Sequence, residues 1–221
     1  GTHPPSEENP EARLRMIPLV IASRNEKKVR EIRDILQGLP FELLSIRDFP
    51  HAPEPEENGR TFEENAVIKA CAAARASGHI SLADDSGLCV EALEGAPGVF
   101  SARFAGKEQD DLANCLKLLS LMQALPEEKR AAFFQCVVAI CHPKEGVLGV
   151  TRGEYHGSVA CDMRGSHGFG YDPVFLDPIT GKRFAELEPA VKDRISHRAK
   201  ALERARQILA RYDAKVTGSK Y

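Results

Sequence analysis

Hydrophobic and polar positions along the chain follow two periods, one typical of β-strands and the other of α-helices. Short apolar runs rich in branched residues predict strands at residues 17–22, 41–46, 80–83, 131–141, 147–157 and 174–176. Apolar residues at helical spacing predict helices at residues 26–36, 61–77, 109–124 and 193–212. Because strands and helices alternate without an internal repeat, the sequence predicts a single α/β domain over residues 16–213.

The two ends of the chain are predicted to lie outside this domain. Residues 1–15 are rich in Pro, Glu, Asn and Ser and lack apolar periodicity, which predicts a flexible N-terminal extension. Residues 214–221 are predicted to form a flexible tail after the last helix. Within the domain, Thr61 and Glu64 have capping-box spacing, so the second helix is expected to start at Thr61 and to end at Gly78.

Composition and charge narrow the class of protein. The 221 residues include 30 Lys+Arg and 32 Asp+Glu, a net charge of −2, which argues against a protein that coats nucleic acid. The longest apolar run, at residues 133–141, is far shorter than the roughly 20 residues that cross a bilayer. The chain does not open with a secretory pattern. We therefore expect a soluble, cytoplasmic protein that binds neither nucleic acid nor a membrane.

The cysteine pattern does not indicate a disulfide scaffold or a zinc finger. No two cysteines form a C-x-x-C pair, and a disulfide scaffold is not expected at this length and cysteine content. Most of them stand in apolar surroundings, where a free thiol behaves as a small hydrophobic group. We therefore expect reduced cysteines in the core: Cys71, Cys89, Cys115, Cys136, Cys141 and Cys161.

A candidate anion site lies where the first strand leads into the first helix, at residues 23–28. A helix N-terminus offers unpaired N–H groups and the positive end of the helix dipole. Ser23, Asn25 and Lys28 add polar and cationic side chains at this point. The segment lacks the Walker A spacing. Phosphate binding is one interpretation, and lysines solvated on an exposed helix face are the alternative.

Candidate metal ligands come from two acidic segments. Asp84 and Asp85 follow a buried strand, at the edge of the sheet where ligands commonly bind. Because adjacent strand residues point to opposite faces, the two aspartates are expected to have different roles. The acidic loop at residues 50–59 contains Glu56 and Glu57, and one such glutamate with one aspartate would suit Mg²⁺ bound to substrate phosphates. A polar turn and a solvated acidic loop are the structural alternatives.

Two further segments carry residue types found in nucleotide sites. Residues 166–173 place glycines around Phe169 and then Asp172, which is typical of a tight loop that presents an aromatic ring to a ligand. Near the last helix, Lys192, His197 and Arg198 offer donors for a base or a phosphate. Packing or surface charge also explains each segment alone. Together the four segments supply the parts that hold a nucleoside triphosphate with Mg²⁺.

Six motifs in a fixed order resemble those of the inosine triphosphate pyrophosphatase (Ham1-like) family, from about residue 17 to residue 209. They are Ser23-x-Asn25-x-x-Lys28, Thr61-Phe62-x-Glu64-Asn65-Ala66-x-x-Lys69-Ala70, Ala83-Asp84-Asp85-Ser86-Gly87-Leu88, Gly95-Ala96-Pro97-Gly98-Val99-Phe100-Ser101-Ala102-Arg103, Gly168-Phe169-Gly170-Tyr171-Asp172-Pro173 and Ile195-Ser196-His197-Arg198.

The resemblance implies a fold and an activity. Members of the family hydrolyse non-canonical purine nucleoside triphosphates (ITP, dITP and XTP) to the monophosphate and pyrophosphate with Mg²⁺, which cleanses the nucleotide pool. Their fold is an elongated, central mixed α/β sheet flanked by helices, with the substrate cleft between two lobes, and they are usually homodimers. The same fold, activity, Mg²⁺ cofactor and homodimer are therefore expected here.

The resemblance also assigns roles to single residues. Asp85 is implied to be a metal ligand and the catalytic proton acceptor, and Glu56 the second metal ligand, although the alignment of the loop leaves Glu57 open. Substrate contacts are implied for Ser23, Arg24, Asn25, Glu26, Lys27, Lys28, Lys69, Ser86, Phe169, Gly170, Tyr171, Asp172, Lys192, His197 and Arg198. Arg24 and His167 stand where many members of the family have glycine.

Selectivity is expected to depend on the 6-oxo group that hypoxanthine and xanthine share. A donor such as Arg198, or a backbone N–H, would be left unpaired by the 6-amino group of adenine. Two alternatives remain at this point. One is a Maf-like nucleotide pyrophosphatase, which the segments around Phe169 and His197 disfavour. The other is a nucleotide-binding sensor without catalytic activity.

Overall fold

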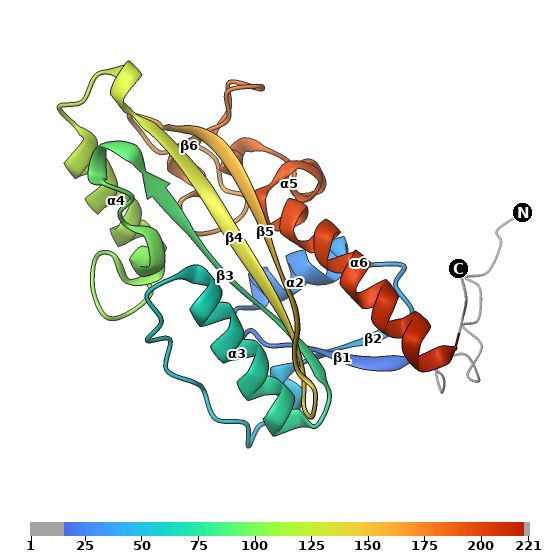
Figure 1. Ribbon diagram of the computed structural model, residues 1–221. Coiled ribbons are helices and arrows are strands. Elements are labelled where there is room, and N and C mark those ends of the chain that lie inside the picture. Colours follow the sequence, from blue (N-terminus) through green and yellow to red (C-terminus); the bar gives the residue numbers. More distant parts are fainter. Residues whose placement is uncertain (1–15, 219–221) are drawn as a thin grey trace, which may run out of the picture.

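The computed structural model describes residues 16–218, and these residues form a single mixed sheet of six strands in the order β2-β1-β3-β4-β5-β6 (Figure 1). β1 pairs in parallel with β2 and β3, and the later neighbours pair antiparallel. The strands are β1 (Ile17–Ile21), β2 (Phe41–Ser45), β3 (Ile80–Val90), β4 (Ala131–His142), β5 (Gly146–Val159) and β6 (Phe175–Leu176). The predicted mixed α/β sheet is confirmed.

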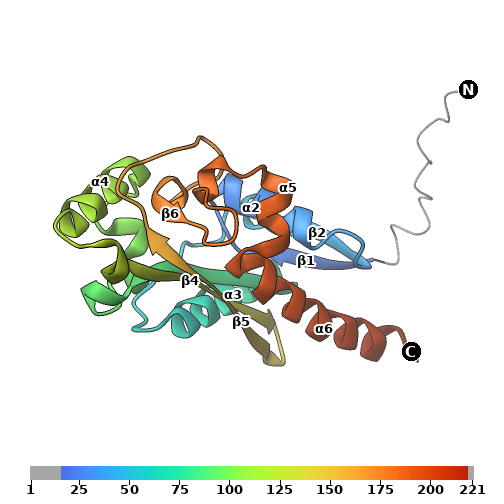
Figure 2. The ribbon, with the colours of Figure 1, turned by 90° about the horizontal axis from the view of Figure 1, so that it is seen from above.

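Five α-helices flank the sheet in the described part of the chain: α2 (Glu26–Ile35), α3 (Phe62–Ser77), α4 (Asp111–Met122), α5 (Pro189–Ile195) and α6 (His197–Thr217). Side chains alternate between the faces of the long strands. Leu82 of β3 packs with α2 and α6, whereas its neighbour Ala83 packs with α3. Helices α2 and α3 therefore lie on opposite sides of the sheet (Figure 2).

Two separate apolar clusters occupy the α2 side of the long strands. Leu82 belongs to the cluster formed with β1, α2 and α6. Leu88, further along β3, belongs to a second cluster formed with α4, β6 and the aromatic side chains Phe175 and Phe184. The residues of β3 between them on this face, Asp84 and Ser86, are polar. The candidate site lies at these two positions, where the apolar core is interrupted.

Three expected boundaries are wrong. β3 does not end before Asp84 but continues to Val90, because its ladder with β4 pairs residues 81–90 without a break. The last predicted helix is two helices, because Ser196 has an extended backbone and its Oγ accepts the Ala199 N–H as the N-cap of α6. α6 continues to Thr217, so residues 214–217 are not a tail. Residues 1–15 and 219–221 lie outside the described residues.

The cysteines are free thiols, and most of them lie in the core as expected. The prediction is wrong for Cys161, which is exposed, and Cys71 is only half-buried. The buried cysteines are Cys89, Cys115, Cys136 and Cys141. Between residues 16 and 218, none of the helices has the length and apolar character that a membrane span requires.

Candidate active site

A cleft of about 960 Å³ opens beside the polar stretch of β3. Most of the residues expected to bind substrate line it: Ser23, Arg24, Asn25, Lys28, Lys69, Asp85, Ser86, Phe169, Gly170, Tyr171, Asp172, Lys192, His197 and Arg198. Glu57 also lines the cleft. Glu26, Lys27 and Glu56 are not among the lining residues, so the structure does not bring these three expected contacts to the cleft.

The N-terminus of α2 faces the cleft through a short capped turn. The Asn25 side chain accepts hydrogen bonds from the backbone N–H groups of Lys27 and Lys28, at 3.1 and 3.2 Å. Ser23 Oγ in turn accepts the Asn25 N–H at 3.2 Å. These contacts fix the first turn of α2, so that Lys28 projects from a rigid position.

The other residues of this segment have different partners. Arg24 donates to the Ala52 carbonyl at 2.9 Å while it lines the cleft, so its side chain is bound to the acidic loop. Glu26 forms an exposed ion pair with Arg47 at 2.7 Å. Lys27 is exposed. Of this segment, the side chain that adds a charge close to β3 is therefore Lys28.

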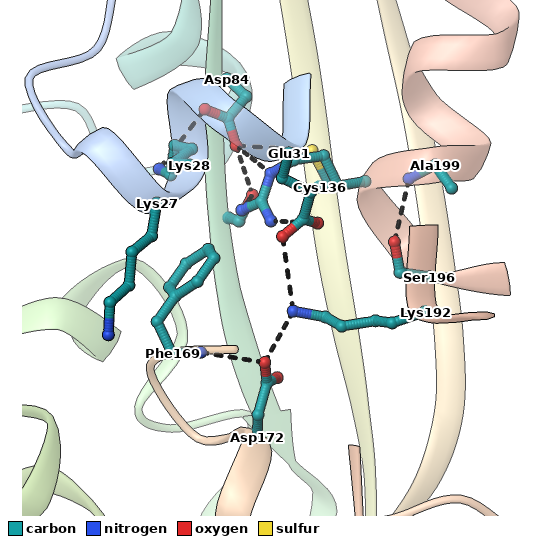
Figure 3. Close-up of polar contacts among 12 residues, drawn as sticks. Lys27, Lys28, Glu31, Asp84, Cys136, Phe169, Asp172, Lys192, Ser196 and Ala199 are labelled. Atoms are coloured by element: carbon teal, nitrogen blue, oxygen red, sulfur yellow. Dashed lines mark hydrogen bonds and ion pairs between the residues drawn. The ribbon is translucent and has the colours of Figure 1, made fainter. Parts of the chain in front are cut away.

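Asp84 lies at the centre of a buried network of ion pairs (Figure 3). Its Oδ1 lies 3.4 Å from Lys28 Nζ. Its Oδ2 accepts hydrogen bonds from Ser86 Oγ at 2.8 Å and from Arg198 Nε at 3.1 Å. Burial alone would raise the pKa of Asp84, but Lys28 and Arg198 outweigh burial and lower the pKa well below its ordinary value. Asp84 is therefore a permanently ionised group that holds cations in place.

Glu31 extends this network, although no sequence motif singles it out. Its carboxylate lies 2.9 Å from Arg198 Nη1 and 3.5 Å from Lys192 Nζ, and Lys192 also binds Asp172 at 2.6 Å (Figure 3). Burial would raise the pKa of Glu31, yet the two cations lower it. The signal that could have found Glu31 is its position three residues after Lys28, on the same face of α2.

Asp85 lies in a second polar cluster on the other face of β3. Lys69 Nζ is 3.6 Å from Asp85 Oδ1 and 2.7 Å from Glu57 Oε1. Asp85 Oδ2 is buried without a hydrogen-bond partner. Burial raises the pKa of Asp85, with a further rise from Glu57 that Lys69 opposes. An unpartnered, buried carboxylate oxygen is costly unless a ligand or an ion completes it.

The donor set around Asp85 fits a hard divalent cation. Asp85 contributes an unpartnered carboxylate oxygen, and Glu57 contributes a second carboxylate held by the same lysine. Mg²⁺ prefers one or two carboxylates completed by substrate phosphates and water. Of the two glutamates that the sequence left open, the structure favours Glu57, because Glu57 lines the cleft and Glu56 does not.

The segment 168–172 forms a tight loop on the other side of the cleft. Gly168 has a φ of +72°, and a Cβ there would lie 2.1 Å from the Asp172 carboxylate, so the position requires glycine. Asp172 accepts the Phe169 N–H at 3.2 Å. The Phe169 ring has the Lys192 ammonium 4.9 Å from its centroid. The loop therefore presents an aromatic ring next to the buried cations.

His197 and Arg198 both lie deep in the site. The His197 ring stacks on Phe134 with centroids 4.6 Å apart, and burial lowers its pKa well below the ordinary value, so the imidazole is neutral. The three guanidinium nitrogens of Arg198 each contact a protein group, namely Asp84, Glu31 and Ser86. Arg198 therefore holds the two carboxylates together, and it is less available to donate to a base than the sequence predicts.

His167 lies outside the cleft. Its Nε2 is 3.8 Å from a Glu188 carboxylate oxygen, and 43% of its side chain is exposed. His167 is not among the lining residues. His167, which stands where many members of the family have glycine, therefore does not form part of the wall of the cleft.

The fold and the site define a class of protein: a mixed α/β sheet whose cleft combines a helix N-terminus, buried lysines and a carboxylate, a set suited to a phosphorylated ligand. Comparison with known sequences gives the family. Residues 19–208 match the Ham1 family over most of the chain. The chain belongs to the Ham1 family.

Named relatives share a large part of this sequence. A dITP/XTP pyrophosphatase from Geobacter sulfurreducens is 51% identical, over 85% of this chain and 94% of the relative. A dITP/XTP pyrophosphatase from Desulforamulus reducens is 48% identical, over 87% of this chain and 96% of the relative. The chain thus spans nearly the whole length of both relatives.

Solved structures show the same fold. A HAM1 protein from Coxiella burnetii superposes with a TM-score of 0.80 at 40% identity, and the match covers 89% of this chain and all (100%) of that one. A nucleoside-triphosphatase / dITP/XTP pyrophosphatase from Mycobacterium abscessus has a TM-score of 0.70 at 41% identity, covering 86% of this chain and 98% of that one.

Proposed function

We propose that this protein hydrolyses non-canonical purine nucleoside triphosphates, namely dITP, XTP and ITP, to the nucleoside monophosphate and pyrophosphate. The names of the Geobacter and Desulforamulus relatives support this substrate class. The observation in the structure that carries the proposal is Asp85. Asp85 lines the cleft beside Lys69, and one of its carboxylate oxygens is buried without a partner, so a cation bound with a phosphate group would complete it.

The proposal includes Mg²⁺ held by Asp85 and Glu57. The support is the donor set, because two carboxylates that share one lysine match the preference of this ion for oxygen ligands. Mg²⁺ bound there would neutralise negative charge on the phosphate oxygens. The fit rests on residues from two segments, the acidic loop and β3, which meet at Lys69 of helix α3.

Different residues of the chain are proposed to accept the proton and to stabilise the negative charge of the leaving group. Asp85, which lines the cleft, accepts the proton of the attacking water. Lys28 and Lys69 lie on either side of β3 and stabilise the leaving pyrophosphate, together with the N-terminus of α2. Asp84 and Glu31 hold Arg198 and Lys192 in place rather than contacting the reacting atoms.

The base is proposed to lie against the loop that carries Phe169. Its ring offers a stacking surface, and selectivity is proposed to come from a donor to the 6-oxo group of the base. A site that donates to this oxygen would leave its donor unpaired with adenine, which disfavours ATP by roughly 10⁴-fold. His197 is neutral, so it reads a ligand through hydrogen bonds rather than through charge.

The remaining proposals concern the chain as a whole. Residues 16–213 are proposed to act as one two-lobed domain, and the two apolar clusters at the ends of the long strands support that division. A homodimer is proposed from the resemblance to the family, and exposed Phe100, Leu112 and Leu116 supply apolar surface for it. A cytoplasmic location, without nucleic-acid or membrane partners, agrees with the balanced charge.

Turnover of a substrate panel tests the proposed function. ITP, dITP, XTP, GTP, ATP and dUTP are incubated with the enzyme and Mg²⁺, and then with EDTA. Metal-dependent release of pyrophosphate from ITP, dITP and XTP, with little from ATP, is the expected result. Tight binding of dITP without turnover would show a sensor instead, and turnover of dUTP or other pyrimidines in preference would favour a Maf-like activity.

A further inference from the structure

Helix α4 holds the loop that presents Phe169 through the backbone of one residue, Gly170. Asp111, the first residue of α4, accepts a hydrogen bond from the Gly170 backbone N–H at 2.9 Å. Cys115, one turn later on the same helix, donates from Sγ to the Gly170 carbonyl at 3.3 Å. Both polar groups of Gly170 are therefore bound by two side chains that are 59 and 55 residues away in the sequence.

The conformation of Gly170 makes this double contact feasible. Its φ is +62°, in the left-handed region that glycine adopts readily, and this turns the N–H toward Asp111. Cys115 is fully buried, and burial raises its pKa to about 12, so the thiol keeps its proton and remains a donor. The two contacts are thus complementary in hydrogen-bonding character.

Among the hydrogen bonds of residues 16–218, only the two at Gly170 connect this loop to α4. The neighbouring residues of the loop form hydrogen bonds with residues outside α4. Phe169 N–H binds Asp172, and the Tyr171 hydroxyl donates to the Ser101 carbonyl at 2.6 Å. A loop bound at each residue is ordered before a ligand arrives. Loss of the tie to α4 would free the peptide between Phe169 and Tyr171, and with it the ring.

We propose that Asp111 is a positioning residue for nucleotide recognition, which orders the Phe169 loop by accepting the Gly170 N–H. This inference rests on the proposed function, because it takes the ligand of the loop to be a nucleotide base. Asp111 acts through Gly170 and does not contact the reacting phosphate. Its role therefore predicts a change in KM rather than in kcat, and the effect depends on hydrogen-bond acceptance rather than on negative charge.

Three variants separate these possibilities. Asp111→Ala removes the acceptor. Asp111→Asn keeps an acceptor oxygen and removes the charge. Asp110→Ala is the matched control, because Asp110 is the N-cap of α4, its carboxylate accepts the Ala113 N–H at 3.0 Å, and it does not bind the loop. Loss of that cap perturbs the same end of the same helix without touching Gly170.

Two readouts are measured on each variant of the full chain. The first is steady-state hydrolysis of dITP, for which Asp111→Ala is expected to raise KM about tenfold, with kcat changed less than about threefold. Asp111→Asn is expected to restore KM to within about threefold of wild type, and Asp110→Ala to leave KM unchanged. The second is amide hydrogen exchange of Gly170 without nucleotide, expected to speed up at least about tenfold in Asp111→Ala alone.

The outcomes distinguish this inference from the proposed function. If the wild type does not turn over dITP, the proposed function fails, and Gly170 exchange still reports whether the tie orders the loop. If the wild type is active but Asp111→Ala leaves KM and Gly170 exchange unchanged, the positioning role is overturned. An Asp111→Asn variant as impaired as Asp111→Ala would also overturn it, because charge and not acceptance would then be the cause.

Discussion

Asp84 and Asp85 are neighbours in β3, but they face opposite sides of the sheet and have opposite electrostatic environments. Asp84 binds Arg198 and Lys28, and its pKa is lowered despite burial. Asp85 has a buried oxygen without a partner, and burial raises its pKa. The folded protein stabilises the ionised form of Asp84. The ionised form of Asp85 is unfavourable in the folded protein, and a bound cation with substrate would stabilise it.

Replacement of Asp85 by asparagine is expected to remove activity and to preserve the fold. The variant loses the proposed proton acceptor and metal ligand, so kcat for dITP is expected to fall by at least about a hundredfold. The melting temperature is expected to stay the same or to rise, because a poorly compensated buried charge is removed. Steady-state kinetics and thermal unfolding check both parts, and a kcat within about tenfold of wild type would refute the role of Asp85.

The same substitution at Asp84 is expected to act mainly on stability. Asp84→Asn leaves Arg198 and Lys28 without their shared counter-ion, and breaking a buried ion pair on one side costs about 3–5 kcal/mol. Denaturant unfolding measures the loss directly. A variant as stable as Asp85→Asn would show that the network around Asp84 is not a stabilising feature of the fold.

The two glutamates of the acidic loop give a matched pair for the metal. Glu57→Gln is expected to raise the Mg²⁺ concentration for half-maximal activity by about tenfold or more, because Glu57 lines the cleft and binds Lys69. Glu56→Gln, next to it on the chain, is expected to change this concentration by less than about threefold. Mg²⁺ titrations of dITP hydrolysis measure both variants, and a larger effect from Glu56 would assign the ligand to that residue.

Asp193 is expected to make stability depend on pH. Burial, with the negative charges of Glu31 and Asp34, raises its pKa from 3.8 to about 6, although Lys192 and Arg198 oppose the rise. Between these two pKa values the native state binds more protons than the unfolded state, so stability falls as pH rises through this window. Asp193→Asn is uncharged and is expected to be more stable than wild type above about pH 6.

Unfolding across the pH range checks this sign. The melting-temperature difference between Asp193→Asn and wild type is expected to be largest near about pH 8 and to disappear as pH falls below about pH 4. Because the two proteins share all other titrating groups, the pH dependence of this difference reports the titration of Asp193. A difference that is constant with pH would show that Asp193 titrates normally in the folded protein.

Much of the fold followed from local sequence patterns. Apolar periodicity predicted the strands and helices that build the sheet, and period-two alternation placed Asp84 and Asp85 on opposite faces. What the patterns could not show is set by partners far apart in the sequence. Glu31 and Arg198 are 167 residues apart, and the continuation of β3 through its polar residues depends on pairing with β4. The break at Ser196 depends on one side-chain cap.

The sequence predicted most of the residues of the candidate site, but it did not predict which of them form ion pairs with one another. Most expected residues line the cleft, although Lys69 lies within α3 and Asp85 and Ser86 lie within β3 rather than at junctions between elements. The sequence could not show that Arg198 is bound by carboxylates, or that Lys69 brings Glu57 next to Asp85, since both depend on the packing of α3 and α6 on opposite faces of the sheet.

The identity of the bond that is cleaved tests the central claim most directly. dITP is hydrolysed with Mg²⁺ in water enriched in heavy oxygen, and the products are resolved by phosphorus NMR and mass spectrometry. The account predicts dIMP and pyrophosphate, with the heavy oxygen on the phosphate of dIMP, because the water attacks the α-phosphorus. Release of dIDP and orthophosphate, or heavy oxygen in the pyrophosphate, would contradict it.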